Sequence, residues 1–283
     1  MNNIYFINNT SNITYIFNSI LLLVIFSTII ISIYKKKTIW YFLSLILISI
    51  YYCLQVTEYF DNTNLFKLYS FWTGTNQESE ARKNCFNTLK NSELDVILIT
   101  KNNLNDYIKE PLHEGFQYLS ETHKADYLRT YFMHFYGGGY SDIKKTSESW
   151  LSSVKILEEN PSIWAVGYKE VGPGGIPDIP NNSLLTQEMK NNWEIMIGNC
   201  AYIFKKNTPL TLEWYSTMMK VMDNKLENLK KYPGRTPTEI YTAEYPYPLE
   251  WSELLANIFH PIIYKYRNHI VNSLPAPDFN NYR

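Results

Sequence analysis

Four charged residues between positions 122 and 146 have the types and spacing to do chemistry, namely Asp126, Arg129, Asp142 and Lys144. Aspartate oxygens accept hydrogen bonds from hydroxyl groups, and arginine or lysine can stabilise negative charge that develops on a leaving group. Asp126 and Arg129 are three residues apart, so on a helix they would share a face and point into a cleft or toward each other. This one stretch therefore contains both acceptors and cations for the handling of a polar substrate.

A helix followed by a glycine turn is predicted to position these residues. The apolar stripe of that helix consists of Ala125, Leu128, Phe132 and Phe135. Residues 137–139 are three glycines, which end the helix because glycine adopts backbone conformations that other residues resist. The chain then continues into a short strand-like segment at residues 140–144. A helix, a glycine break and an acidic strand end are how an α/β fold presents a carboxylate at the rim of its sheet, where ligands bind.

The rest of the globular part alternates between strand and helix patterns. Residues 68–72 and 95–100 flank a helical pattern at residues 78–89, which predicts a βαβ unit whose second strand is buried in a parallel sheet. Further apolar strand candidates are residues 162–168 and 200–204. This alternation predicts an α/β layer fold with helices on both faces of the sheet.

The first 54 residues carry only three charged side chains, Lys35 to Lys37, which separate two uncharged apolar runs. The run at residues 15–34 has the length of about 20 residues that a helix needs to span a bilayer. The run at residues 38–54 is shorter, and its alternatives are a second span, an interfacial helix or a buried core helix. We therefore predict a membrane anchor in residues 1–54 and one globular domain in residues 55–283.

The three lysines also predict the orientation of the anchor. If both runs span the membrane, the positive-inside rule places the lysines in a cytoplasmic turn and the globular domain on the far side. In a secretory pathway that side is the lumen of the endoplasmic reticulum or Golgi. If only one run spans, the domain faces the cytoplasm instead.

Charge and cysteine content exclude several classes of protein. The chain has 26 basic and 27 acidic residues, a balance that excludes a strongly basic nucleic-acid binder. Its three cysteines are widely spaced and form neither a disulfide framework nor a zinc-binding pattern. No nucleic-acid partner is therefore expected.

The stretch from residue 125 to residue 142 resembles the D-x-D-containing, sugar-binding region of glycosyltransferases such as the initiating mannosyltransferases of yeast outer chains and the capsular polysaccharide synthesis proteins. That family has a helix with an aspartate and an arginine three residues apart, followed by Y-G-G-x-Y-x-D-x-D. Here Asp126 and Arg129, then residues 136–142, match the pattern in order and spacing. Residues 71–74, Phe-Trp-Thr-Gly, are similar to the W-x-G element of the family's first strand.

The resemblance implies a GT-A-like α/β fold. It also implies transfer of a hexose from a nucleotide-sugar donor to a glycan or lipid-linked acceptor, with retention of anomeric configuration. Asp142 is the implied catalytic residue, which orients the hydroxyls of the sugar. The implied donor-binding residues are Asp126, Arg129, Gly138, Gly139, Tyr140, Lys144, Trp72 and Gly74.

The family further implies a divalent cation, Mn²⁺ or Mg²⁺, with Asp142 as a ligand. This chain departs from the pattern where the second aspartate is expected, because position 144 is lysine. A protonated lysine repels a cation, so either Lys144 itself supplies the positive charge or Asp142 holds a metal with other oxygen ligands. His260 is a further candidate metal ligand, although a histidine beside aromatic residues is often purely structural.

Each assignment has an alternative. Asp126 and Arg129 could form only a structural ion pair. Asp142 could be a turn residue, and Lys144 a solvated surface charge. The whole chain could be a non-catalytic nucleotide-sugar or glycan-binding protein on the same fold. A glycoside hydrolase with Asp126 and Asp142 as its carboxylate pair is less favoured, because both belong to one short helix-turn segment.

Other regions could also contribute to ligand binding. Residues 172–183 are rich in glycine and proline and form one long loop, and such loops are often lids or binding loops. Asn199, just before a predicted strand, could reach the sugar. Aromatic residues in 241–251 and 264–266 could be platforms for an acceptor sugar, or they could simply pack a terminal helix and loop.

Overall fold

The structure is a computed structural model that describes residues 25, 27–30, 43–49, 51, 65–238, 242–280 and 282. The chain divides into two compact units, Met1–Phe60 and Asp61–Arg283. The expected membrane spans, residues 15–34 and 38–54, fall largely outside the described residues. Within the described residues, no helix combines the length and the apolar character needed to span a membrane.

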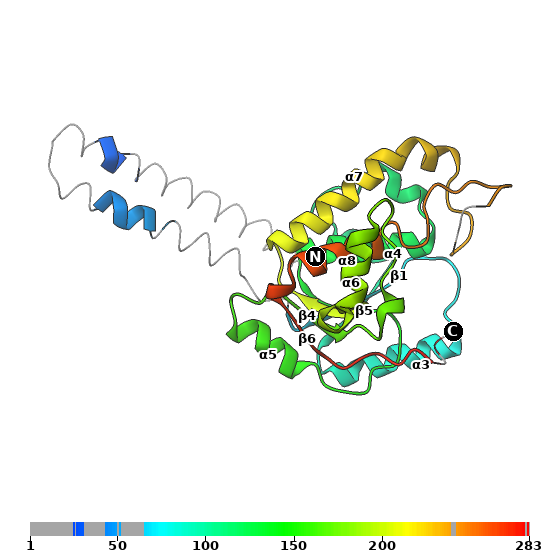
Figure 1. Cartoon of the computed structure of the whole chain (residues 1–283), viewed down its shortest axis with the longest axis horizontal. Coiled ribbons are helices and arrows are strands. Elements are labelled where there is room, and N and C mark those ends of the chain that lie inside the picture. The colour runs from blue at the N-terminus through cyan, green and yellow to red at the C-terminus, as the bar shows by residue number, and fades with distance from the viewer. Residues whose placement is uncertain are drawn as a thin grey trace. The chain divides into compact units, whose positions relative to one another are not determined.

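In the described part of the chain, the second unit is built on one six-stranded sheet (Figure 1). Its strands are β1 (Lys67–Trp72), β2 (Asp95–Thr100), β3 (Gly138–Ser141), β4 (Ala165–Lys169), β5 (Ile197–Phe204) and β6 (Ile270–Leu274). The order across the sheet is β2-β1-β3-β5-β4-β6. β5 is antiparallel to β3 and β4, whereas β1 pairs in parallel with β2 and β3, and β4 with β6. This mixed α/β sheet fits a GT-A-like fold.

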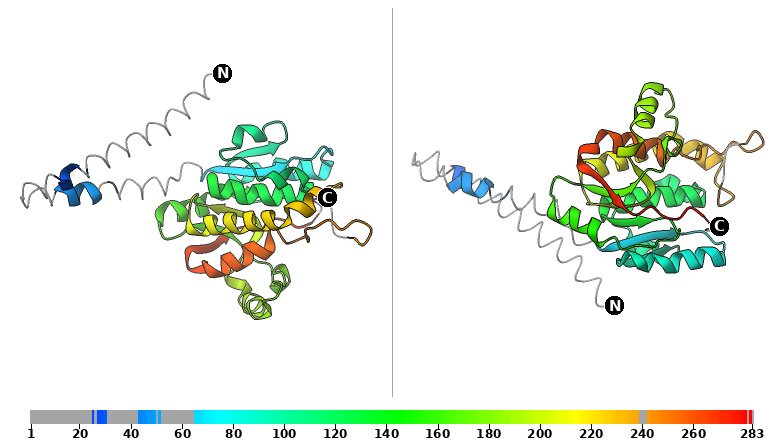
Figure 2. Two further views of the ribbon diagram at one scale, coloured as in Figure 1. Left: turned by 90° about the horizontal axis from the view of Figure 1, so that it is seen from above. Right: turned by 60° about the horizontal axis from the view of Figure 1, so that its bottom comes forward.

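Helices cover both faces of the sheet, as the alternation of patterns predicted (Figure 2). One face is covered by α3 (Glu80–Thr88) and α5 (Leu151–Glu159). The other face is covered by α4 (Glu121–Phe135), α7 (Pro209–Lys231) and α8 (Ala256–Lys265), which lie side by side. Among the described residues of this unit, the remaining α-helix is α6 (Ser183–Asn191), which follows the Gly- and Pro-rich loop.

Two apolar cores result, one on each face. Successive side chains of a strand point to opposite faces, so Leu68 and Tyr69 of β1 enter different cores. In β5, Ile203 likewise packs on the side of α3 and α5, while Tyr202 packs with α4, α7 and α8. The sheet is therefore buried on both sides and provides a rigid support for residues at its edges.

The predicted βαβ unit is present, because α3 connects β1 to β2 and these strands pair in parallel. Ser79 caps α3 by accepting a hydrogen bond from the Arg82 backbone N–H. The expectation that residues 95–100 are buried was wrong, since only Ile99 of this strand is buried. β2 is an edge strand with β1 as its one described strand neighbour, so much of its side-chain surface stays half-exposed.

The turn that ends α4 depends on Gly137, whose φ of 66° lies in the left-handed region. A Cβ there would lie 2.8 Å from both the backbone nitrogen of Lys206 and the carbonyl oxygen of Phe204. We expect Gly137→Ala to lower the free energy of unfolding by about 2–3 kcal/mol in urea denaturation. Gly174→Ala is the matched control, because no atom lies within 4 Å of its Cβ position. Equal losses in the two variants would contradict this account.

The sheet topology brings the carboxyl ends of β1 and β3 together. β2 and β3 flank β1 on opposite sides, so the connections reverse direction there and create a topological switch point. Trp72 ends β1, and Asp142 follows the last residue of β3. The Ser70 hydroxyl joins the two strands by donating to the Ser141 carbonyl at 2.7 Å. We call this region the β1–β3 edge.

Candidate functional site

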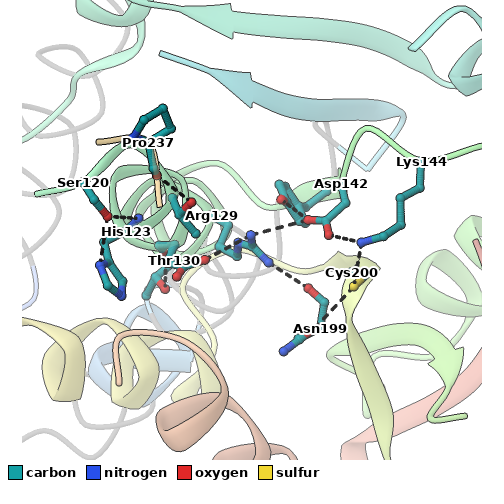
Figure 3. Close-up of polar contacts among 12 residues, drawn as sticks. Ser120, His123, Arg129, Thr130, Asp142, Lys144, Asn199, Cys200 and Pro237 are labelled. Carbon is teal, nitrogen blue, oxygen red and sulfur yellow. Dashed lines mark hydrogen bonds and ion pairs between the residues drawn. The ribbon is translucent and has the colours of Figure 1, made fainter. Parts of the chain in front are cut away.

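Asp142 lies at the β1–β3 edge and is the centre of a polar network (Figure 3). Its Oδ1 accepts a hydrogen bond from the Tyr140 hydroxyl at 2.5 Å and lies 3.4 Å from Arg129 Nη2. Its Oδ2 accepts a hydrogen bond from the Lys144 ammonium. The Asp142 backbone N–H donates to the Cys200 carbonyl at 2.8 Å. The side chain is 22% exposed, so the carboxylate is held firmly while part of it faces solvent.

Arg129 joins the two aspartates of the motif. Its Nη2 lies 3.1 Å from Asp126 Oδ1 and 3.4 Å from Asp142 Oδ1. Its Nη1 donates to the Asn199 carbonyl at 3.0 Å, as Figure 3 shows. The guanidinium also packs over the Tyr140 ring, 4.5 Å from its centroid. Asp126 and Arg129 are 3% and 6% exposed, so of the two arrangements left open by the sequence they adopt the one in which they face each other.

Two buried groups next to this network have no hydrogen-bond partner among the described residues, Arg129 Nε and the Tyr202 hydroxyl. Buried polar groups are normally paired with protein or water. A bound water or a ligand hydroxyl would therefore be stabilised beside Arg129.

The charged groups differ in their affinity for protons. Burial by itself raises the pKa of Asp142, but Lys144 and Arg129 outweigh burial and hold that pKa well below its usual range. The pKa of Asp126 is raised, because burial outweighs the attraction of Arg129. Burial lowers the pKa of Lys144, yet the Asp142 carboxylate outweighs it and raises that pKa overall. At neutral pH Asp142 is ionised and Lys144 is its counterion.

Residues 278–280 and 282, which we call the C-terminal segment, pack beside the ammonium of Lys144. Lys144 is only 6% exposed. The centroids of the Phe279 and Tyr282 rings lie 5.4 and 4.9 Å from Lys144 Nζ. The Asp278 backbone N–H donates to the Lys145 carbonyl at 3.0 Å, which joins this segment to the residues after β3. The ammonium is therefore packed between the Asp142 carboxylate and these two rings.

The residues around Asp142 do not fit a divalent cation. Both carboxylate oxygens accept hydrogen bonds from side-chain donors, one of them the ammonium of Lys144. A cation bound here would lie against that positive charge. Among the residues that the structure describes, there is also no group of three His, Cys, Asp or Glu side chains able to hold a metal.

His260 is fully buried on α8. Its Nε2 lies 3.3 Å from Glu170 Oε2, and its Nδ1 lies 3.3 Å from the Ala256 carbonyl oxygen. Glu170 follows β4, and the Gly-rich loop packs against it, because a Cβ on Gly175 would lie 2.3 Å from Glu170 Oε1. These contacts favour a structural role for His260 in anchoring this loop over a role in binding metal.

The remaining donor-binding candidates divide between the β1–β3 edge and the sheet interior. Trp72 and Gly74 are half-buried at this edge, where Trp72 is the last residue of β1. Gly138 and Gly139 are buried within the sheet and pair with β5. A Cβ on Gly139 would lie 3.0 Å from Leu68 Cδ1, so this glycine permits close packing of β1 on β3. Contact of these four residues with a donor stays a prediction.

Some parts of the site could not be identified from the sequence. The Cys200 carbonyl that holds the Asp142 backbone comes from a strand that pairs through the sheet, and a backbone group leaves no signal in side-chain types. Phe279 and Tyr282 lie more than 130 residues from Lys144 in the chain, and only their aromatic character hints at a cover for an ammonium group.

Comparison with known proteins found one family model that is similar to part of the chain. A family model described as capsular polysaccharide synthesis protein matches residues 32–143, which is less than half of the chain. No curated protein and no solved structure matches the chain. The matched range contains Asp126, Arg129 and Asp142 and ends just before Lys144. The chain is thus similar, over this range, to capsular polysaccharide synthesis proteins, a similarity that supports a role in polysaccharide biosynthesis.

Proposed function

We propose that this chain is a membrane-anchored glycosyltransferase that transfers a hexose from a nucleotide-sugar donor to a glycan or lipid-linked acceptor, with retention of anomeric configuration. The observation that carries the proposal is the ionised Asp142 at the carboxyl end of β3, held between Arg129 and Lys144. In α/β sheets, ligands bind outside the carboxyl ends of the strands at a switch point. The similarity to capsular polysaccharide synthesis proteins supports the same class of reaction.

Each charged residue has its own role in this proposal. Asp142 accepts hydrogen bonds from hydroxyls of the donor sugar through the exposed part of its carboxylate. Arg129 and Lys144 stabilise the negative charge of the nucleoside diphosphate leaving group. The carboxylate of Asp126 forms an ion pair with Arg129, so its proposed role is that of a positioning residue that holds the guanidinium of Arg129. Movement of the C-terminal segment exposes the ammonium of Lys144 to the phosphates.

Transfer is expected to be independent of divalent cations, because Lys144 supplies the positive charge next to Asp142. Initial rates should be the same in EDTA, Mn²⁺ and Mg²⁺. Lys144→Met removes the ammonium and keeps an unbranched side chain, so kcat should fall about 100-fold. Lys145→Met is the matched control, because Lys145 is the exposed neighbour of Lys144 and its loss should leave kcat at the wild-type value. A strict requirement for Mn²⁺ would contradict this role of Lys144.

We also propose that residues 1–54 anchor the enzyme in the membrane with the catalytic domain on the lumenal side. The support is the position of Lys35 to Lys37 between the two apolar runs. A cytoplasmic domain is the alternative if only one run spans. Protease treatment of sealed vesicles distinguishes the two, because a lumenal domain is protected until detergent is added.

A panel of nucleotide sugars, incubated with the full chain with and without acceptors, tests the proposed function. Release of nucleoside diphosphate that depends on Asp142 supports the transferase. Nucleotide-sugar binding without release under every condition would identify a binding protein instead. Glycan cleavage without any nucleotide would identify a hydrolase, which is disfavoured because the buried Asp126 carboxylate is paired with Arg129.

A further inference from the structure

A second candidate site lies away from the Asp142 network, between the C-terminal half of α7 and residues 246–250. It is a cavity of about 500 Å³, within the size range of small-molecule sites. Two tyrosines, Tyr232 and Tyr247, and two prolines, Pro246 and Pro248, form its apolar wall, and Asn228 contributes an amide. We call this cavity the α7 pocket.

The charges of the α7 pocket argue against a phosphate ligand. Lys225 lines it, but its ammonium is engaged by Glu253 at 2.8 Å and by the Pro248 carbonyl at 2.8 Å. Glu250 adds an exposed carboxylate to the same wall. An anion would be repelled by that carboxylate, whereas the hydroxyls of a neutral ligand could donate to it and to the Asn228 amide oxygen.

The α7 pocket lies next to the N-terminal end of α4. α4 ends where the chain enters β3, so α4 begins at the β1–β3 edge. At that beginning, the Ser120 backbone N–H donates to the Tyr247 hydroxyl at 3.1 Å, and His123 Nδ1 lies 3.0 Å from the same hydroxyl. His123 precedes Arg129 by six positions on α4, which is about 9 Å along the helix axis. The α7 pocket and the Asp142 network are therefore connected through α4.

We propose that the α7 pocket binds a neutral oligosaccharide, the non-reacting part of the glycan acceptor. This proposal rests on the proposed function, which supplies the donor site. The C–H faces of pyranose rings pack on the faces of tyrosines, and the ring hydroxyls bond to amide and carboxylate groups. Tyr232 and Tyr247 are the tyrosines that line the pocket, and Asn228 and Glu250 supply the polar groups.

Calorimetric titration of the full chain with neutral tetrasaccharides of glucose, mannose, galactose and N-acetylglucosamine tests the proposal. At least one should bind, and Tyr232→Ala and Asn228→Ala should each weaken it by about tenfold. Asn228 is exposed, so its variant tests the pocket even if Tyr232→Ala lowers stability. Tyr264→Ala is the matched control, because this half-buried tyrosine is outside the pocket and its loss should leave affinity unchanged.

The outcomes separate this proposal from the proposed function. Asp142→Asn should bind the tetrasaccharide as the wild type does, and Asn228→Ala should keep wild-type hydrolysis of the donor in the absence of acceptor. The pocket assignment is overturned if no tetrasaccharide binds, if the pocket variants bind normally, or if pyrophosphate competes at the pocket. Failure of the proposed function would appear separately, as a wild-type chain that never releases nucleoside diphosphate from any donor.

Discussion

Asp142→Asn is expected to lower kcat for sugar transfer by at least about 100-fold. The amide keeps the shape of the carboxylate but removes the negative charge that Arg129 and Lys144 surround. It also places an N–H donor where the Tyr140 hydroxyl or the Lys144 ammonium now donates, so the local hydrogen bonds can no longer all form. Release of nucleoside diphosphate, measured per mole of folded protein, checks this result.

A loss of stability must be separated from this loss of activity. Without the carboxylate, the buried Lys144 has no anionic partner, and the free energy of unfolding should fall by about 3 kcal/mol. The double variant Asp142→Asn/Lys144→Gln removes both charges and should recover much of that stability without recovering kcat. Asp178→Asn is the matched control, because this aspartate is 84% exposed and pairs with Lys190 at the surface. A folded Asp142→Asn protein with wild-type kcat would refute the role of Asp142.

Arg129→Met is expected to have the largest effect on stability, with a loss of about 3–5 kcal/mol in the free energy of unfolding. Arg129 holds Asp126, Asp142 and the Asn199 carbonyl together. Its removal leaves the carboxylate of Asp126, a residue that is 3% exposed, without its salt-bridge partner. Urea denaturation at neutral pH measures the change. The second substitution Asp126→Asn should restore part of the loss, since it removes the stranded charge.

The pH dependence of this variant provides an independent check. The pKa of Asp126 is already raised by burial, and losing Arg129 removes the main effect that opposes burial. A native carboxyl group with a raised pKa binds more protons than the unfolded chain, so stability increases as the pH falls through the native pKa toward the pKa of the unfolded chain. Arg129→Met should therefore lose less stability at mildly acidic pH than at neutral pH. Arg267→Met, at an exposed arginine, should change stability by less than about 0.5 kcal/mol at either pH.

The pattern of the motif region was enough to predict its local structure. Leu128 and Phe132 are fully buried on α4, and the chain turns at Gly137 into a strand, as predicted. The bounds of that strand differ from residues 140–144: β3 is Gly138–Ser141, because Gly138 and Gly139 pair with β5 as part of the sheet, and Asp142 follows the strand. Helical spacing and a glycine break leave clear signals because they depend on neighbours a few residues apart. The parallel pairing of β1 and β2 could be predicted for the same reason, since a short βαβ unit joins them.

The burial and the neighbours of each charged residue could not be predicted as well from the sequence. The stripe of apolar residues suggested one buried face for α4, but the helix packs against both the sheet and α7, so Asp126 is buried as well. The burial of residues 95–100 was overestimated, because apolar composition does not reveal which strand lies at the edge. β6 was not predicted at all, since Ile270–Leu274 mixes polar and apolar residues without a clear pattern.

The sequence by itself determined which residues could carry charge chemistry and where the chain would turn. It placed Asp126 and Arg129 on one helix, and Asp142 and Lys144 just after a glycine break. Only the tertiary structure decided that Arg129 joins both aspartates and that Lys144 neutralises Asp142 beneath the C-terminal rings. The physical reason is that proton affinity and metal binding depend on burial and on charges within a few ångströms, and these neighbours come from segments far apart in the chain.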